Sequence, residues 1–288
     1  MNIDCYKCHH RNIIKLVDKH TIDVQVKAEQ IGHLTNLLHK HGDESNVLVS
    51  TLVHREARNL LQSDDFYLNE KDKANKLLLN NYQHWENIVK QSSIPYYTAL
   101  KLAIIGNIID YGAHSVPDDI EQYINEKLSC SISLDESNKL FNEITNAKKV
   151  LYLGDNCGEI VFDKLFLETI NHSNVTFAVR GLPVINDVTQ READMVGMNK
   201  VAKVISNGFD APSTLLEYCS LEFKEAFDSA DIIISKGQGN LEGLLHNDDP
   251  RLYFLLTAKC HYIASIMDVT KGDLVVTNAS SIKRNQWL

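Results

Sequence analysis

The segment VLYLGDNCGEIVFDKLF, residues 150–166, joins an apolar run to a helical pattern through a short polar turn. The apolar run ends at Gly154, and Asp155, Asn156 and Glu159 follow before the helical pattern resumes. Nucleotide-binding proteins often place glycines at this junction, so that a phosphate can approach the backbone. Acid and amide side chains would instead supply oxygen atoms to a cation. This turn therefore predicts a strand-to-helix unit with a polar site beside it.

Short apolar runs of the same kind recur through the second half of the chain. They are KVLYLG, VTFAVRG, KVISNG, DIIISKG, YIASIMDV and LVVTN, and helical stretches separate them. Apolar runs that alternate with helices indicate a mainly parallel sheet that is buried on both faces. We therefore predict an α/β fold, with a Rossmann-like α/β/α domain over residues 146–288.

The first half of the chain has helical patterns instead. Apolar residues recur at helical spacing in the segments TIDVQVKAEQIGHLTNLLHKHG, SNVLVSTLVHREARNLL and KANKLLLNNYQHWENIVKQ. Ser45 is a suitable N-cap and Pro95 a suitable first-turn residue for two of the predicted helices. These patterns predict a helical domain over residues 1–145.

Composition argues against several classes of protein. The chain has 288 residues and a formal net charge of -9, which argues against a nucleic-acid partner. No run approaches the ~20 apolar residues of a membrane span, so we expect no membrane partner. The polar N-terminus does not resemble a secretory signal. We expect a cytoplasmic protein that handles small molecules or metals, and the sequence leaves its oligomeric state open.

Polar side chains follow four of the predicted strands. Ligands of an open parallel sheet bind beyond the carboxyl ends of its strands, where such side chains would meet. The first two strands are followed by Asp155 and Asn156, and by Arg180, Asn186, Asp187 and Asp194. The third is followed by SNGFDAPST, and the fourth by Lys236, Gln238, Asn240 and Glu242. Four such loops in succession predict a polar pocket above the sheet.

The residue types in this pocket suit phosphate-ester chemistry. Asp155, Asn156 and Asp187 offer oxygen ligands, which hard divalent ions such as Mg²⁺ or Mn²⁺ prefer. Lys236 and the amides of the glycine-rich turn after it suit an anion. Taken singly, Asp155 could cap a helix, Asp187 could lie in a turn, and Lys236 could be a solvated loop residue. Their grouping at successive strand ends favours a site. The chain contains neither a G-x-x-x-x-G-K-[ST] loop nor a G-x-S-x-G elbow.

Three of these stretches together resemble the metal-dependent damage-control phosphatase family. They are GDNCGEIVFDKL, RGLPVINDVT with the downstream Asp194, and SKGQGNLEG. The upstream GNIIDYG, residues 106–112, resembles the helical-domain motif of that family, and the N-terminal C-x-x-C resembles its archaeal and bacterial branch. The resemblance implies a helical domain packed on a Rossmann-like domain. It also implies hydrolysis of small phosphate esters, including sugar phosphates and damaged metabolites.

The resemblance also assigns roles to residues. It implies one divalent ion, Mg²⁺, Mn²⁺, Co²⁺ or Ni²⁺, on Asp155, Asn156 and Asp187, and a phosphate contact from Lys236. Asn107 and Asp110 match the helical-domain motif and would complete the pocket. Arg180, Asn240 and Glu242 are further candidates for binding substrate or phosphate.

The chemical step has two open forms. Asp155 or Asp187 either orients a water molecule or attacks phosphorus directly. The D-x-D spacing of aspartyl-phosphate enzymes is absent at residues 155–157, which favours water activated by the metal. Cys157 stands where alanine or another small residue is frequent in the family, and we interpret it as a small buried filler. Two rival functions are a methyltransferase that uses S-adenosylmethionine on carboxyl groups, and a regulator that binds metal or phosphometabolite without catalysis.

Cys5 and Cys8 form the one close cysteine pair in the chain. The C-x-x-C spacing suits zinc, an iron–sulfur cluster or dithiol chemistry, so a second metal site or a redox site is one interpretation. A tetrahedral site needs further ligands, which His9, His10 or Cys260 could supply in space. The alternative is a pair of reduced thiols near the N-terminus.

Overall fold

The computed structural model describes residues 1–106 and 119–282, so Asn107 and Asp110 lie outside the described residues. The helices are α1 (Ile3–His20), α2 (Val24–Lys40), α3 (Asn46–Leu61), α4 (Leu68–Asn80), α5 (Tyr82–Gln91), α6 (Pro95–Ile105), α7 (Ile120–Ser129), α8 (Ser137–Asn146), α9 (Glu159–Ile170), α10 (Gln190–Val196), α11 (Leu221–Ser229), α12 (Gly237–Leu244) and α13 (His261–Met267). The strands are β1 (Leu134–Asp135), β2 (Val150–Leu153), β3 (Val175–Val179), β4 (Lys203–Ser206), β5 (Ile232–Lys236), β6 (Leu252–Thr257) and β7 (Leu274–Asn278).

The strands form one sheet in the order β1-β7-β6-β5-β2-β3-β4. Every neighbouring pair is parallel except β6 and β7, which are antiparallel. From β2 the chain builds outward through β3 and β4, and it then returns to place β5 on the other side of β2. The carboxyl ends of β2 and β5 therefore meet at a topological switch point, where an α/β sheet leaves a crevice for a ligand.

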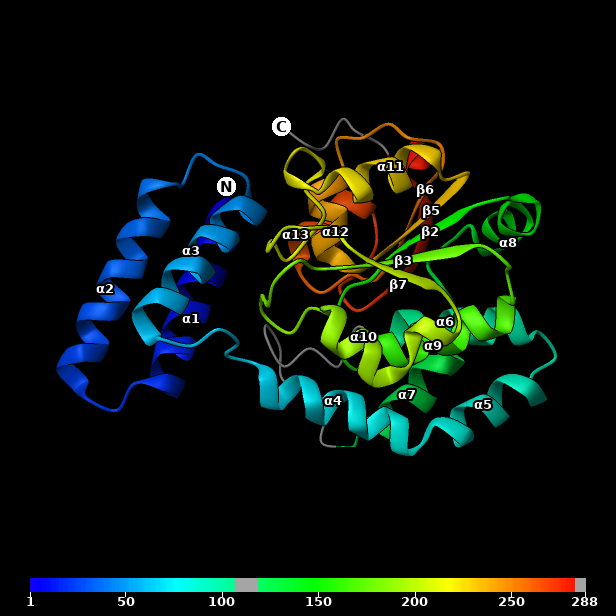
Figure 1. The fold of residues 1–288 in the computed structure, drawn as a ribbon, viewed down its shortest axis with the longest axis horizontal. Helices are drawn as coiled ribbons and strands as arrows, with labels where there is room; N and C mark the ends of the chain where they lie inside the picture. The colour runs from blue at the N-terminus through cyan, green and yellow to red at the C-terminus, as the bar shows by residue number, and fades with distance from the viewer. Residues whose placement is uncertain (107–118, 283–288) are drawn as a thin grey trace.

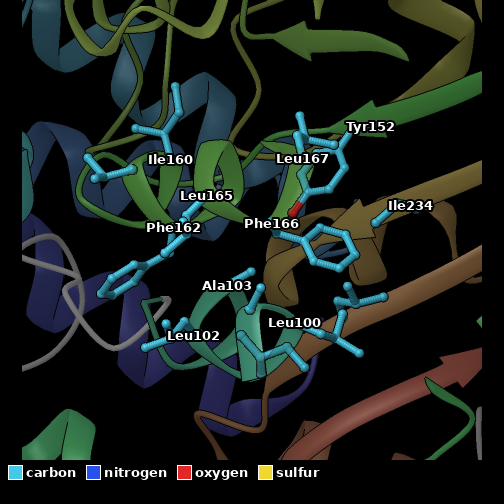
Figure 2. Packing of buried hydrophobic residues seen from close by; sticks show 14 of the residues in the cluster. Leu100, Leu102, Ala103, Tyr152, Ile160, Phe162, Leu165, Phe166, Leu167 and Ile234 are labelled. Atoms are coloured by element: carbon cyan, nitrogen blue, oxygen red, sulfur yellow. The ribbon is translucent and has the colours of Figure 1, made fainter. Parts of the chain in front are cut away.

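Helices cover both faces of the sheet (Figure 1). On one face, α6 and α9 pack against each other and against the sheet, and Figure 2 shows Phe162 and Phe166 of α9 near Leu100 and Leu102 of α6. On the other face, α11, α12 and α13 bury a second apolar cluster that contains Phe223 and other aromatic and aliphatic side chains. Because helices cover both faces, β2, β5 and β6 are buried along their whole length, and their residues are apolar except Ser235, Lys236 and Thr257. The α/β fold with a mainly parallel sheet is confirmed.

Helices α1, α2 and α3 form a unit with its own apolar cluster, beside the rest of the molecule in Figure 1. Side-chain caps begin all three helices: Asn2, Asp23 and Ser45 each accept a hydrogen bond from a first-turn amide. Helices α4 to α6 instead share their apolar cluster with the sheet and α9. The predicted division at residues 145/146 falls in the last turn of α8, just before β2, and stays a prediction.

One predicted strand was wrong. YIASIMDV lies largely in α13, and the preceding run LYFLLT forms the buried strand β6. Cys260 caps α13 by accepting a hydrogen bond from the Ile263 amide through its sulfur, so the helix begins directly after the strand. Pro95 begins α6, as predicted. Within residues 1–106 and 119–282, no helix is both long and apolar enough to cross a membrane.

Candidate active site

A cavity of about 980 Å³ lies at the carboxyl edge of the sheet. Helices α1 and α3 line one side of it, and the segments that follow β2, β3, β5 and β6 line the other. The predicted residues Asp155, Asn156, Asp187 and Glu242 all border this cavity. The loops after the strands therefore meet as the sequence predicts, and the second wall comes from the N-terminal helices.

Backbone contacts join the two loops that carry the predicted metal ligands. Asn156 and Asp187 form an isolated antiparallel bridge, and the Val188 amide donates to the Asp155 carbonyl at 2.8 Å. Gly158, not Asp155, is the N-cap of α9, and Thr189 forms the capping box of α10. Asp155 and Asp187 are thus not helix caps, and both residues border the cavity.

Arg180 contacts the carboxylates of both Asp155 and Asp187 from the buried side of the site. Its Nε donates to Asp187 Oδ2 at 2.6 Å, and its Nη2 lies 3.6 Å from Asp155 Oδ1. Its Nη1 donates to Asn240 Oδ1 at 3.0 Å, and Asn240 Nδ2 donates in turn to the carbonyls of Gly154 and Lys236. Both side chains are buried and neither lines the cavity. Arg180 and Asn240 therefore lie behind the cavity wall, where Arg180 holds the carboxylates of Asp155 and Asp187 in place.

Gly237 makes room for Asp155. Its φ of +76° lies in the left-handed region, which favours glycine. A Cβ at this position would lie 1.7 Å from Asp155 Oδ2, a distance at which both atoms cannot be accommodated. Gly237, the first glycine of SKGQGNLEG, therefore leaves space for the Asp155 carboxylate. The sequence pattern instead predicts that the amides of this turn bind an anion.

Lys236 ends β5 as predicted, but its side chain is directed away from the cavity. Its Nζ is fully buried and donates to Asp163 Oδ1 at 2.6 Å, to Glu159 Oε1, and to the Ala103 carbonyl at 2.8 Å. Burial alone would lower the pKa of Lys236, but Asp163 and Glu159 outweigh burial and raise it. Lys236 does not border the cavity, because both carboxylates of α9 hold it on the inner side of the turn. Its position does not support the predicted contact with phosphate.

The cavity side of the same turn carries excess negative charge. Burial, and then the charges of Glu159 and Asp187, raise the pKa of Asp155 well above its ordinary range. The described residues contain no group of three or more His, Cys, Asp or Glu side chains arranged for a metal, and the predicted ligands are two carboxylates and an amide. Asn186, which also lines the cavity, has both side-chain polar atoms buried without a hydrogen-bond partner in the described part of the chain. Clustered oxygen donors, a desolvated carboxylate and an unsatisfied amide fit a hard divalent cation.

Lys259 is a cavity residue that the sequence analysis missed. It follows β6 and lines the same cavity as Asp155 and Asp187. Its positive charge counteracts the rise in the pKa of Asp155, so the two groups are electrostatically coupled. The rule that located the other loops would have found Lys259 if LYFLLT had been recognised as a strand.

Glu242 borders the cavity where α12 meets α3. It accepts hydrogen bonds from Asn46 of α3 and, at 3.1 Å, from Gln238, and burial raises its pKa. Cys5, Cys8 and Cys260 line this part of the cavity. Burial, and then Glu242, Cys260 and Cys8, raise the pKa of Cys5 to about 12. The predicted metal or redox role of the cysteine pair stays a prediction.

Comparison with known proteins identifies relatives over nearly the whole chain. The sequence profile of the damage-control phosphatase ARMT1-like domain matches residues 1–275. A damage-control phosphatase of Pyrococcus horikoshii is 34% identical over 278 residues, which cover 94% of this chain and 96% of that protein. A damage-control phosphatase of Archaeoglobus fulgidus is 31% identical over 236 residues, which cover 80% of this chain and 81% of that protein.

A solved structure agrees with the sequence comparisons. The crystal structure of a DUF89 family protein from Pyrococcus horikoshii superposes with a TM-score of 0.87 at 33% identity, and it covers 97% of this chain and 99% of that chain. The resemblance inferred from the sequence motifs is confirmed. The chain belongs to the damage-control phosphatase ARMT1-like family.

Proposed function

We propose that this chain is a metal-dependent phosphatase that hydrolyses small phosphate esters, such as sugar phosphates or damaged phosphometabolites, in the cytoplasm. Membership in the damage-control phosphatase family supports phosphatase activity. The observation that carries the metal-dependent form is the convergence of Asp155, Asn156 and Asp187 on one cavity at the switch point of the sheet.

Asp155, Asn156 and Asp187 would hold one divalent ion, Mg²⁺, Mn²⁺, Co²⁺ or Ni²⁺. Such an ion supplies Lewis acidity and charge neutralisation to a phosphoryl group. Arg180 keeps the two carboxylates in place from the buried side, because it contacts both of them. An outer residue that positions metal ligands in this way is usually needed for full affinity.

Lys259 replaces Lys236 as the cation that we assign to the phosphate. Both lysines follow strands at the carboxyl edge, but Lys259 lines the cavity and Lys236 does not. Phosphate hydrolysis develops charge on the phosphoryl oxygens, and a cation fixed at the cavity wall stabilises it. Asn186, with its unsatisfied amide, is the second residue positioned to bind substrate or a water molecule there.

The test is hydrolysis of p-nitrophenyl phosphate by protein stripped of metal and then supplied with each of the four ions. We expect at least one ion to restore activity, and Asp155→Asn and Asp187→Asn to lower it by about 100-fold or more. Asp194→Asn is the matched control, because Asp194 is an exposed acid of α10 that does not line the cavity. Full activity without any metal, or in Asp155→Asn, would contradict the proposal.

The two rival functions give different results in the same preparation. A methyltransferase would bind S-adenosylmethionine in a calorimetric titration. A regulator without catalysis would hold a phosphorylated ligand that is recovered unchanged after incubation with metal. Hydrolysis that depends on both metal and Asp155 separates the phosphatase from both alternatives.

A further inference from the structure

A row of cations on α1 faces the cavity. Lys7, Arg11 and Lys15 are spaced four residues apart, which places them on one side of the helix, and all three line the cavity. Like charges at this spacing repel one another and destabilise a helix. The row is therefore unfavourable for the helix alone, in a chain whose net charge is -9.

Within the described part of the chain, acidic side chains leave most of this row without a partner. Lys7 lies 3.9 Å from Asp4, at the limit of an ion pair, and both side chains are mostly exposed. The side chains of Arg11 and Lys15 make neither a hydrogen bond nor an ion pair with any described residue. Lys271, which lines the cavity from the loop between α13 and β7, likewise has no such partner there.

The arginines of α3 show that this is not a general property of the helical unit. Arg55 and Arg58 both bind Asp210, at 2.5 Å each, and so join α3 to the loop after β4. Arg55 and Arg58 connect the helical unit to the α/β unit and are paired with Asp210. The side chains of Arg11, Lys15 and Lys271 have no such partner among the described residues. An anion from solution would supply the missing partner.

The cavity is also larger than one phosphate ester requires. Its volume of about 980 Å³ is at the upper end of the roughly 300–1,000 Å³ that is usual for ligand pockets. Asp155, Asn156, Asp187 and Lys259 account for the reacting phosphate at the edge of the sheet. The α1 row belongs to the opposite wall, so it is placed to meet a different part of the substrate.

We infer that the substrate is a phosphate ester with a second anionic group, a carboxylate or another phosphate, and that Arg11 and Lys15 bind this second group. This inference rests on the proposed phosphatase function and names the substrate class of the same site. Arg11 offers a planar fork to either kind of anion, and Lys15 adds a point charge one helical turn away. Lys271 reinforces the positive potential from the loop.

The test compares matched substrates on the full chain. Glucose 6-phosphate carries one anionic group, 6-phosphogluconate adds a carboxylate, and glucose 1,6-bisphosphate adds a phosphate. We expect a lower KM for one or both two-anion substrates. The double variant Arg11→Ala/Lys15→Ala should raise that KM about ten-fold or more, because hydrogen bonds between charged groups are lost. Its kinetics with glucose 6-phosphate should stay within two-fold of wild type.

Two controls isolate the role of the row. Lys40→Ala removes an exposed lysine from the end of α2, outside the cavity, and should change no KM. Arg11→Lys keeps the charge and should retain part of the preference. Comparing the KM values for 6-phosphogluconate and glucose 1,6-bisphosphate shows whether the row binds a carboxylate or a second phosphate.

Failure of the inference differs from failure of the proposed function. Equal KM values for all three substrates, or a double variant that affects all three equally, would overturn the inference while phosphatase activity stands. If no phosphate ester is hydrolysed, calorimetric titration with 6-phosphogluconate still tests the inference. Weaker binding by the double variant than by wild type would support it, and unchanged binding would refute it. Much tighter binding of heparin than of any small anion would assign the row to an acidic macromolecule instead and overturn the inference.

Discussion

Residues 155–163, the turn after β2 and the first residues of α9, contribute to two charged clusters, one on each side of the segment. The inner cluster is Glu159, Asp163 and Lys236, and the cavity cluster is Asp155, Asn156 and Asp187. In the inner cluster the lysine pairs with both carboxylates and the group is sealed from solvent. In the cavity cluster two carboxylates share Arg180, and burial and neighbouring charge raise the pKa of Asp155.

The difference between the clusters separates stability from chemistry. The two carboxylates of the inner cluster are buried around Lys236 and do not reach the cavity, so the inner cluster serves to hold the turn. A desolvated carboxylate pair at a cavity wall favours an added cation, so the cavity cluster is suited to reaction. The two clusters touch at Glu159, whose Oε2 accepts a 3.4 Å hydrogen bond from the Asn156 amide while Oε1 binds Lys236.

The largest effect on stability should come from breaking the inner cluster. Lys236→Met leaves Glu159 and Asp163 buried without their cation, and we expect the free energy of unfolding to fall by about 3–5 kcal/mol. Urea denaturation followed by circular dichroism measures the loss. Adding Glu159→Gln and Asp163→Asn to this variant removes the unpaired charges and should recover part of it.

Lys259→Met is the matched control, because it makes the same substitution on the cavity wall. Stability should change by less than about 1 kcal/mol, while kcat/KM for p-nitrophenyl phosphate falls. If Lys236→Met were as stable as wild type and Lys259→Met fully active, our division of roles between the two lysines would be wrong.

The next largest effect should follow from displacing Asp155 without changing its charge. Gly237→Ala introduces a Cβ at a φ of +76° and into the space of Asp155 Oδ2. A displacement of about 1 Å in a reacting group can cost about 100-fold in rate, and we expect a loss of that order in kcat/KM. Gly32→Ala is the control, because no atom lies within 4 Å of a Cβ there. A fully active Gly237→Ala would show that Asp155 need not occupy this position.

Sequence reasoning located the cavity cluster because its rule concerns the backbone. Asp155 and Asp187 follow adjacent parallel strands, and the carboxyl ends of such strands meet whatever the side chains are. Lys236 also ends a strand, but its side chain turns inward to Glu159 and Asp163. The position of a residue at the end of a strand predicts the edge of the sheet at which it lies. The partner that its side chain contacts depends instead on tertiary packing, which the strand pattern does not reveal.

The second wall of the cavity was beyond the reach of the sequence for a related reason. Cys5 and Cys260 are far apart in the chain and line one cavity only because the helical unit packs across the edge of the sheet. The pairing of Arg55 and Arg58 with Asp210 fixes that packing, and no spacing in the sequence signals it. Lys259 differs, since a correct strand at residues 252–257 would have placed it at the edge.

The clusters should also differ in their dependence on pH. Burial raises the pKa of Asp163 from 3.8 to about 7, with Lys236 opposing the rise and Glu159 adding to it. The folded state therefore binds more protons than the unfolded state between these values. The contribution of Asp163 to stability is fully present below about pH 4 and is lost as pH rises towards 7, by at most about 1.4 kcal/mol per pH unit.

The difference in unfolding free energy between wild type and Asp163→Asn, measured from pH 4 to pH 8, isolates this contribution. Wild-type stability should fall relative to the variant as pH rises. Asp231→Asn is a flat control over this range, because the Lys148 and Lys149 amides lower the pKa of that exposed carboxylate, so its titration affects stability only below about pH 4. Parallel pH curves for wild type and Asp163→Asn would show that Asp163 is already ionised in the folded protein at low pH.

The smallest effect should come from Cys157, which lies beside the cavity cluster. Its side chain is fully buried, its Sγ lies 3.8 Å from the Asp187 carbonyl, and burial raises its pKa well above the ordinary value, so the thiol stays protonated and unreactive. Cys157→Ala should keep kcat/KM within about two-fold and cost about 1 kcal/mol of stability for the small cavity left behind. In unmodified protein, a thiol reagent should label the exposed Cys130 well before Cys157. A large loss of activity in Cys157→Ala would instead extend the cavity cluster to the thiol and make sulfur part of its chemistry.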